Sequence, residues 1–271
     1  MTETFVSLLR KARINTICES AKCPNLKECF SKRTSTILIL GEGCTRNCRF
    51  CNLNRIRKIF EPDRSEPDKI AEFVKKLKMK YVVITSPTRD DLGEYVARHY
   101  ASVISSIHKK SSCKIEVLTP DFKGFFSSVK IIVDAGIDVF GHNIETVPRL
   151  YKKIRPEANY DLSLSLLNYV KKRYNILTKS GIILGFGETE KEIHQTIKDI
   201  RMAGVDILTI GQYFPPTIDH FPLKKVYSEK EFLDLENYSK SIGFSAVRTG
   251  TYVRSSYCAE EMFEEALKNV S

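Results

Sequence analysis

Hydrophobic residues follow two alternating patterns along the chain. Short continuous apolar runs, rich in β-branched residues, are typical of buried strands. Between these runs, apolar residues recur every three or four positions, as on one face of an amphipathic helix. The runs predict strands at 35–40, 81–85, 114–118, 138–140, 178–184 and 206–210, and the periodic stretches predict helices at about 65–77, 96–107, 127–134, 148–153, 162–173 and 190–203.

Six strand–helix units in series define the predicted fold class. Such a series implies a parallel sheet with right-handed crossovers. Six units at this length favour an α/β fold, a partial (β/α)6 TIM-like barrel, over a flat sheet. We expect N-terminal and C-terminal extensions to cap the barrel mouth. The predicted segments are residues 1–34, with few periodic apolar positions and an irregular course, the barrel at 35–249, and the C-terminal cap at 250–271.

The chain after the sixth predicted strand contains a loop, a helix and one more strand. Residues 211–217 are predicted to form a loop because they are too rich in proline to continue a strand. Residues 228–241 predict a capped helix, and residues 244–247 predict a short strand.

Composition indicates an ordinary globular protein that does not cross a membrane. The chain has 271 residues, enough to bury a full core, and no apolar run approaches the about 20 residues that span a bilayer. The first residues lack the basic start and apolar region of a signal peptide. We therefore expect a cytoplasmic protein, and in that compartment clustered cysteines are metal ligands more often than disulfides.

Six of the eight cysteines lie in two triplets. Cys44, Cys48 and Cys51 follow the first predicted strand, at the end where α/β folds bind ligands. Three thiolates suit a 4Fe–4S cluster with one iron free, and a site with an open position supports chemistry. A zinc site fits less well because the usual second pair of ligands is missing. The other triplet is Cys18, Cys23 and Cys29.

The cysteine spacing with Phe50 before the last cysteine resembles the signature of the radical S-adenosylmethionine enzymes. In that superfamily the free iron chelates the amino and carboxylate groups of S-adenosylmethionine. An electron from the cluster then cleaves the sulfonium and gives a 5′-deoxyadenosyl radical, which removes hydrogen from an unactivated carbon.

Further motifs are similar to those of one family in this superfamily, the lipoyl synthases. The similarity extends from about residue 9 to residue 259. The segment 18–29 resembles that family's auxiliary-cluster motif, and matching motifs lie at 88–92, 116–122, 142–147, 155–156, 178–181, 211–213 and 254–257. The two cysteine triplets together with Arg-Ser-Ser-Tyr at 254–257 are a specific combination.

The resemblance implies roles for individual residues. It places Cys18, Cys23, Cys29 and Ser256, with Ser255 as the alternative serine, as ligands of an auxiliary 4Fe–4S cluster. It places Cys44, Cys48 and Cys51 as ligands of the radical-generating cluster. A serine ligand is bound less firmly than a thiolate, which suits a cluster that is dismantled to supply sulfur. The predicted contacts to S-adenosylmethionine are Thr85, Asn143, Glu145, Arg155 and Gly185, with the glycine allowing close approach of the adenosyl group.

The implied activity is radical insertion of two sulfur atoms at carbons six and eight of an octanoyl chain. The chain is carried on a lysine of a lipoyl carrier protein, such as the glycine-cleavage H protein or a dehydrogenase E2 lipoyl domain. Other implied partners are an electron donor such as ferredoxin or flavodoxin and a carrier that repairs the auxiliary cluster. The net charge of +10 suits the docking of an acidic carrier domain.

Two alternative functions stay open at the level of sequence. One is another sulfur-inserting radical enzyme, acting on biotin precursors or on tRNA. The other is a zinc-dependent nucleic-acid-binding module, which the positive charge also suits. We expect no nucleic-acid partner, because the chain is barely long enough for an added RNA-binding domain.

Overall fold

A computed structural model describes residues 4–56 and 61–270. Residues 1–3 of the predicted N-terminal extension lie outside the described residues. Contacts divide the chain into two compact units, one formed by residues 1–46 and 52–138, and the other by residues 47–51 and 139–271. This division concerns compactness, so the functional segments 1–34, 35–249 and 250–271 stay predictions.

The first unit is built on a small, mostly parallel sheet. Its strands are ordered β1 (Asn15–Thr16), β2 (Thr36–Leu38), β5 (Tyr81–Thr85) and β6 (Lys114–Leu118). Only β1 runs antiparallel to its neighbour. The short strands β3 (Gly43–Cys44) and β4 (Asn54–Arg55) pair separately.

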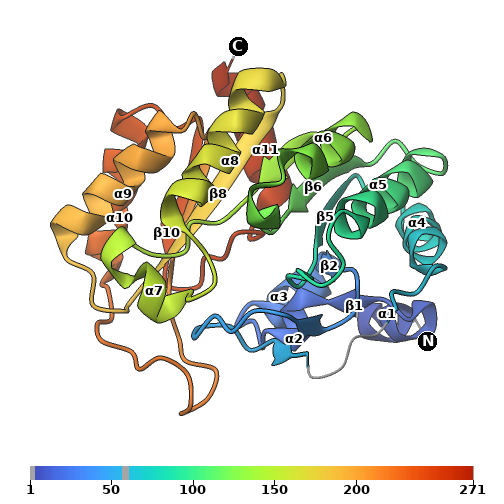
Figure 1. The fold of residues 1–271 in the computed structure, drawn as a ribbon, viewed down its shortest axis with the longest axis horizontal. Coiled ribbons are helices and arrows are strands. Elements are labelled where there is room, and N and C mark those ends of the chain that lie inside the picture. Colours follow the sequence, from blue (N-terminus) through green and yellow to red (C-terminus); the bar gives the residue numbers. More distant parts are fainter. Residues whose placement is uncertain (1–3, 57–60, 271) are drawn as a thin grey trace. The chain divides into compact units, whose positions relative to one another are not determined.

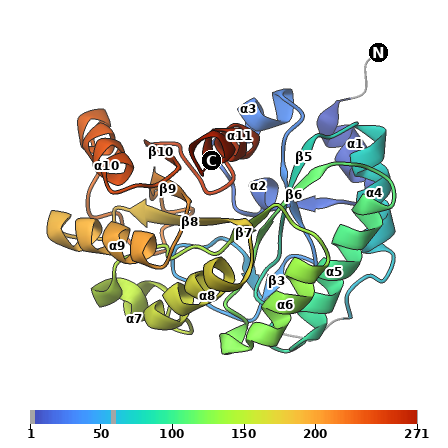
Figure 2. The same ribbon diagram turned by 90° about the horizontal axis from the view of Figure 1, so that it is seen from above.

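Helices α4 (Glu66–Lys76), α5 (Tyr95–His108) and α6 (Phe126–Asp134) belong to the first unit, and η1 (Phe122–Gly124) precedes α6. Figure 2 shows α4, α5 and α6 in a row along the outside of β5 and β6. Their apolar stripes face inward, so that Val74, Val103 and Ile132 have no exposed surface. The helical periodicity of the sequence therefore corresponds to the buried face of each helix.

The expectation of an irregular N-terminal segment is wrong. Over its described residues, 4–34, the structure has three helices: α1 (Phe5–Ala12), α2 (Ile17–Ser20) and α3 (Leu26–Ser31). The Thr4 side chain caps α1, and Phe5 packs edge-on against Phe30 with ring centroids 5.3 Å apart. Phe5, Leu8 and Leu9 are buried, so a short i, i+3, i+4 stripe suffices to fix the helix.

The second unit has a parallel sheet covered by longer helices. Its strands are β7 (Val139–Gly141), β8 (Leu177–Leu184), β9 (Ile207–Gln212) and β10 (Ala246–Gly250), in that order. Figure 1 shows α8 and α9 beside these strands. The helices of this unit are η2 (Pro148–Leu150), α7 (Tyr151–Ile154), α8 (Tyr160–Arg173), α9 (Glu190–Met202), α10 (Glu229–Ser241) and α11 (Ala259–Val270).

Helices α9 and α10 start where the sequence supplies capping boxes. The Thr189 hydroxyl accepts the Glu192 N–H, and the Glu192 carboxylate accepts the Thr189 N–H. Ser228 and Glu231 form the same reciprocal pair at α10. Each box satisfies backbone donors that would otherwise lack partners at the helix start.

The strand predictions are confirmed with shifts of a few residues, and one loop prediction needs correction. Strand β9 continues through Gly211 and Gln212, which were expected to belong to the loop. Their pairing with β8 and β10 extends the strand until the proline pair at 215–216 prevents further pairing. Among the described residues, no helix has the length and apolar character needed to span a membrane.

Candidate functional site

Cys18, Cys23 and Cys29 lie in a compact part of the first unit. Cys18 is on α2, Cys29 is on α3, and Cys23 is in the turn that joins them. The Cys23 N–H donates to the Cys18 carbonyl at 2.9 Å, and the Leu26 N–H donates to the Cys23 carbonyl at 3.2 Å. Two successive turns thus bring the three predicted ligands into one neighbourhood.

The electrostatics of this triplet agree with its compactness. Burial, with smaller contributions from the charges of Cys23 and Cys29, raises the pKa of the Cys18 thiol to about 11, although hydrogen bonds from Thr36 act in the opposite direction. Burial also raises the pKa of Cys29, with the charge of Cys23 as the next cause. Mutual repulsion of thiolates is relieved by a cation, so metal binding would release protons from these thiols.

Cys44 belongs to the first unit and is fixed by its own backbone. It lies on β3, and its carbonyl accepts the Ile56 N–H at 2.8 Å. Its Sγ accepts the Arg46 N–H at 3.4 Å. An N–H directed at a ligand sulfur is one of the means by which proteins tune iron–sulfur clusters.

Arg46, between Cys44 and Cys48, is the organising residue that sequence reasoning missed. Its guanidinium donates two hydrogen bonds to Asp90, at 2.9 and 3.1 Å, and two to Asp121, at 2.6 and 2.5 Å. Arg46 is only 6% exposed. Burial alone would lower the pKa of Arg46, but the hydrogen bonds to Asp121 and Asp90 outweigh it and raise the pKa, so the side chain stays charged.

Neighbouring backbone contacts reinforce the Arg46 anchor. The Thr45 N–H and hydroxyl both donate to the Thr88 carbonyl, and the Asp90 N–H donates to the Thr45 hydroxyl oxygen. Thr88 and Asp90 follow β5, and Asp121 follows β6. Two strand ends of the first unit therefore hold the start of the cysteine segment.

Thr85, the predicted cofactor contact in this unit, is buried at the end of β5. Its hydroxyl donates to the Leu118 carbonyl at 3.0 Å. The donor of this hydroxyl is thus engaged within the sheet, and only the oxygen lone pairs are left for a ligand. Its role toward S-adenosylmethionine stays a prediction.

Cys48 and Cys51 belong to the second unit. The Cys51 N–H donates to the Cys48 carbonyl at 3.1 Å, closing a turn. Arg49, inside this turn, donates its N–H to the Ile154 carbonyl and accepts the Phe221 N–H at its own carbonyl. Main-chain bonds on both sides therefore fix the turn that carries these two cysteines.

Asn143, Glu145 and Arg155 gather beyond β7. The Asn143 amide donates to Glu145 at 3.0 Å, and Arg155 donates to the carbonyls of Asn143 and Ile144 and to the Tyr151 hydroxyl. Burial raises the pKa of Glu145, and the charges of Arg155 and Arg254 act in the opposite direction. The sequence prediction thus selected residues that lie together.

The Asn143 side chain has unused hydrogen-bonding capacity. Its Oδ1 is buried and has no hydrogen-bond partner among the described residues. A Cβ placed on Gly181 would lie 3.2 Å from this oxygen and 2.5 Å from the Thr209 hydroxyl, so only glycine fits beside it. A buried acceptor next to a buried carboxylate fits a ligand that carries N–H or hydroxyl donors.

Position 185 requires a glycine for a structural reason that the sequence did not reveal. Its φ is +131°, and a Cβ there would meet Gln212 Nε2 at 2.6 Å and Leu223 Cδ1 at 2.9 Å. The glycine is therefore required by packing within the chain. Next to it, a Glu188 carboxylate oxygen accepts the N–H groups of Gly185, Phe186 and Gly187, which fixes the loop after β8.

The Arg-Ser-Ser-Tyr segment follows β10. It packs against Gly211. The Val253 carbonyl lies directly against this glycine, and a Cβ placed there would lie 3.2 Å from the Arg254 Nη1. The Tyr257 N–H donates to the Arg254 carbonyl at 2.9 Å, so Ser255 and Ser256 lie within a turn before α11. Because the Arg254 charge acts on Glu145, this turn and the Asn143–Glu145 group share one region of the second unit.

The chemistry of the donor sets fits iron–sulfur clusters, since all eight cysteines are free thiols. Across residues 4–56 and 61–270, however, no three Cys, His, Asp or Glu side chains have the arrangement of a metal site. The ligand roles of the two cysteine triplets and of Ser256 therefore stay predictions.

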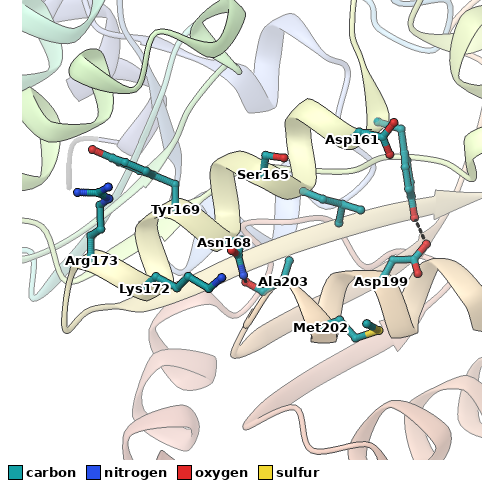
Figure 3. Close-up of a pocket in the computed structure, with 11 residues that line it drawn as sticks. Asp161, Ser165, Asn168, Tyr169, Lys172, Arg173, Asp199, Met202 and Ala203 are labelled. Atoms are coloured by element: carbon teal, nitrogen blue, oxygen red, sulfur yellow. Dashed lines mark hydrogen bonds between the residues drawn. The ribbon is translucent and has the colours of Figure 1, made fainter.

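A groove of about 630 Å³ lies outside this region, between α8 and α9 (Figure 3). Tyr169 and Arg173 line it from α8, and Asp199 and Met202 line it from α9. The Tyr160 hydroxyl donates to Asp199 at 2.8 Å along one side. None of the predicted site residues lines this groove.

Comparison with known proteins identifies the family. Residues 38–200 match the radical SAM superfamily. The lipoyl synthase of Caldicellulosiruptor saccharolyticus is 47% identical over 96% of this chain and 91% of its own length. That of Buchnera aphidicola subsp. Baizongia pistaciae is 49% identical over 95% of this chain and 82% of its own length. The chain belongs to the lipoyl synthase family. Membership in the superfamily implies a 4Fe–4S cluster and S-adenosylmethionine.

Solved structures confirm the fold class predicted for this lipoyl synthase family member. Methylornithine synthase superposes with a TM-score of 0.60 at 14% identity, covering 92% of this chain and 82% of that chain. The FeFe-hydrogenase maturase HydG from Carboxydothermus hydrogenoformans gives 0.64 at 13% identity, covering 97% and 61%. These likenesses support an α/β, partial TIM-like barrel and concern the fold alone. The family assignment disfavours both alternative functions, the zinc-dependent module and the biotin or tRNA enzyme.

Removing one of the two carboxylates that bind the Arg46 guanidinium should destabilise the protein strongly. We expect Asp121→Asn to lower the free energy of unfolding by about 3 kcal/mol, because it leaves a buried guanidinium short of one countercharge. Urea denaturation of the metal-free protein measures this loss. The matched control is Glu94→Gln, whose partner Arg98 is exposed, and it should change stability by less than about 0.5 kcal/mol. Equal effects of the two substitutions would contradict the role of Arg46.

Proposed function

We propose that this chain catalyses the insertion of two sulfur atoms at carbons six and eight of an octanoyl chain attached to a lysine of a lipoyl carrier protein. The observation that carries the proposal is the similarity to lipoyl synthases over nearly the whole chain. The two cysteine triplets, one more than a radical-generating cluster alone requires, support it.

The two triplets have different roles in the proposal. Cys44, Cys48 and Cys51 hold a cluster that, with S-adenosylmethionine, supplies a hydrogen-abstracting radical. Cys18, Cys23, Cys29 and Ser256 hold a second 4Fe–4S cluster that serves as the sulfur source. The compact turns that carry Cys18, Cys23 and Cys29, and the repulsion between their thiolate charges, support binding of a cationic cluster there.

The chain's own residues would orient S-adenosylmethionine. The Asn143 Oδ1 acceptor and the Glu145 carboxylate can accept hydrogen bonds from amino or hydroxyl groups, and Arg155 can pair with a carboxylate. Arg155 in turn fixes the backbone of Asn143. Thr85 and Gly185 complete the proposed contacts, the glycine through its backbone.

The proposal includes partners and a location. The substrate is carried by an acidic protein domain, either the glycine-cleavage H protein or a dehydrogenase E2 lipoyl domain. An electron donor such as ferredoxin or flavodoxin and a cluster-repair carrier complete the cycle. The reduced cysteines support a cytoplasmic location.

A single-turnover assay tests the proposed reaction. Anaerobically reconstituted protein is mixed with an octanoyl-lysyl peptide, S-adenosylmethionine and a strong reductant, and mass spectrometry follows the peptide. We expect the peptide to gain two sulfur atoms. Formation of 5′-deoxyadenosine with an unchanged peptide would leave the radical chemistry standing and refute the substrate.

Replacing the proposed serine ligand should separate radical formation from sulfur transfer. We expect Ser256→Ala to form 5′-deoxyadenosine while sulfur transfer falls by at least about tenfold, because only the auxiliary cluster loses a ligand. The neighbouring substitution Ser255→Ala is the matched control and should behave like the parent. If Ser256→Ala transfers sulfur as fast as Ser255→Ala, Ser256 is not the ligand.

A further inference from the structure

Two exposed apolar side chains lie in the segment that follows β9 (orange in Figure 1). Ile218 is 98% exposed, and Phe214 is 39% exposed. The Phe214 ring stacks on Tyr252, which is 59% exposed, with centroids 6.2 Å apart. Single exposed apolar side chains are ordinary, but two large ones on one short loop, one of them stacked on an exposed tyrosine that follows β10, indicate an interaction site.

This loop, residues 213–221, is held in shape by its own contacts. The Tyr213 hydroxyl donates to the Phe221 carbonyl at 2.8 Å, and the Thr217 hydroxyl and His220 Nδ1 lie 2.8 Å apart. Prolines at 215 and 216 restrict the backbone further. Ile218 is therefore presented on a preorganised loop, which lowers the entropic cost of binding a partner.

The loop is also joined to the turn that carries Cys48 and Cys51. The Phe221 N–H donates to the Arg49 carbonyl at 2.9 Å, and His220 Nε2 lies 3.2 Å from the Cys51 carbonyl. A partner that binds loop 213–221 would therefore lie next to the turn that carries Cys48 and Cys51.

Positively charged side chains lie on this turn and on α7, which is hydrogen-bonded to it. The Arg49 N–H donates to Ile154 at the end of α7, and α7 carries the exposed Lys152 and Lys153. The Arg49 guanidinium lies 5.4 Å from the centre of the Phe221 ring. Within residue 49, residues 152–157 and loop 213–221, the exposed charges are three cations and two acids, Glu157 and Asp219.

We propose that loop 213–221, Tyr252 and the cations Arg49, Lys152 and Lys153 form the docking surface for the acidic carrier domain whose octanoyl-lysine is the substrate. The proposal rests on the proposed function. The acyl chain must reach the region of Cys48 and Cys51, so its carrier must dock on a surface joined to that turn. Ile218 supplies an apolar anchor, and the flanking cations select an acidic partner.

The direct test measures binding of an octanoylated carrier domain to the reconstituted enzyme by fluorescence anisotropy. We expect Ile218→Ser and the double substitution Lys152→Glu/Lys153→Glu each to raise the dissociation constant by about tenfold. Binding to the parent should also weaken as salt is added. The matched controls are Met202→Ser, at an apolar residue on α9 that is 80% exposed, and Lys76→Glu on α4, and both should bind like the parent.

Turnover rates with two substrates, a short peptide and the carrier domain, test the docking surface separately from the proposed reaction. With a short octanoyl-lysyl peptide, the loop variants should match the parent, whereas with the carrier domain their KM should rise by about tenfold. Unchanged carrier binding by Ile218→Ser, or an equal loss in Met202→Ser, overturns the docking surface. If the parent sulfurates neither substrate, the proposed function falls, and the binding comparison still decides the docking surface.

Discussion

The first unit depends on one buried ion cluster, in which the Arg46 guanidinium lies between two carboxylates. Removing a guanidinium from water is costly, and a single carboxylate seldom offsets the cost. Here Asp90 and Asp121 each bind it through two hydrogen bonds, so four of its five donors have charged partners. Because the two aspartates follow different strands, the interaction fixes the loop that starts at Cys44 against both strand ends.

The second unit holds the other half of the cysteine segment by different means. Arg49 uses both of its backbone groups, one toward α7 and one toward loop 213–221, and His220 approaches the Cys51 carbonyl. The two Arg49 contacts join backbone groups and do not depend on side-chain identity, whereas the contact to Cys51 uses the His220 imidazole. A buried ion cluster thus adds to the main-chain hydrogen bonds around Cys44 in one unit, whereas main-chain hydrogen bonds predominate around Cys48 and Cys51 in the other.

Much of the fold could be predicted because the relevant physics is local. The strand at 81–85 and the helix at 66–76 carry their periodicity and start signals within a few residues. Helix α1 was missed because its stripe has only three buried residues, and its aromatic partner lies at Phe30. The end of β9 was misplaced because its pairing partners on β8 and β10 outweigh the local preference for a loop.

The candidate site was only partly predictable. The cysteines and Asn143, Glu145 and Arg155 were selected by resemblance, and the last three do lie together. Arg46 could not be recognised, because its partners lie 44 and 75 residues further along the chain. Gly185 was selected for a contact with the cofactor, although packing against Gln212 already requires a glycine there.

We attribute the sulfur that enters the product to an iron–sulfur cluster bound by the protein, and the proposed holder of that cluster is the triplet Cys18, Cys23 and Cys29. The direct measurement reconstitutes the protein with sulfide of a heavy sulfur isotope, exchanges it into buffer with ordinary sulfide, and determines the isotopic mass of the product after one turnover. We expect both inserted atoms to be heavy, since the bound cluster supplies them. Light sulfur at both positions, in a protein whose clusters are still heavy, would show that the bound clusters are not the sulfur source.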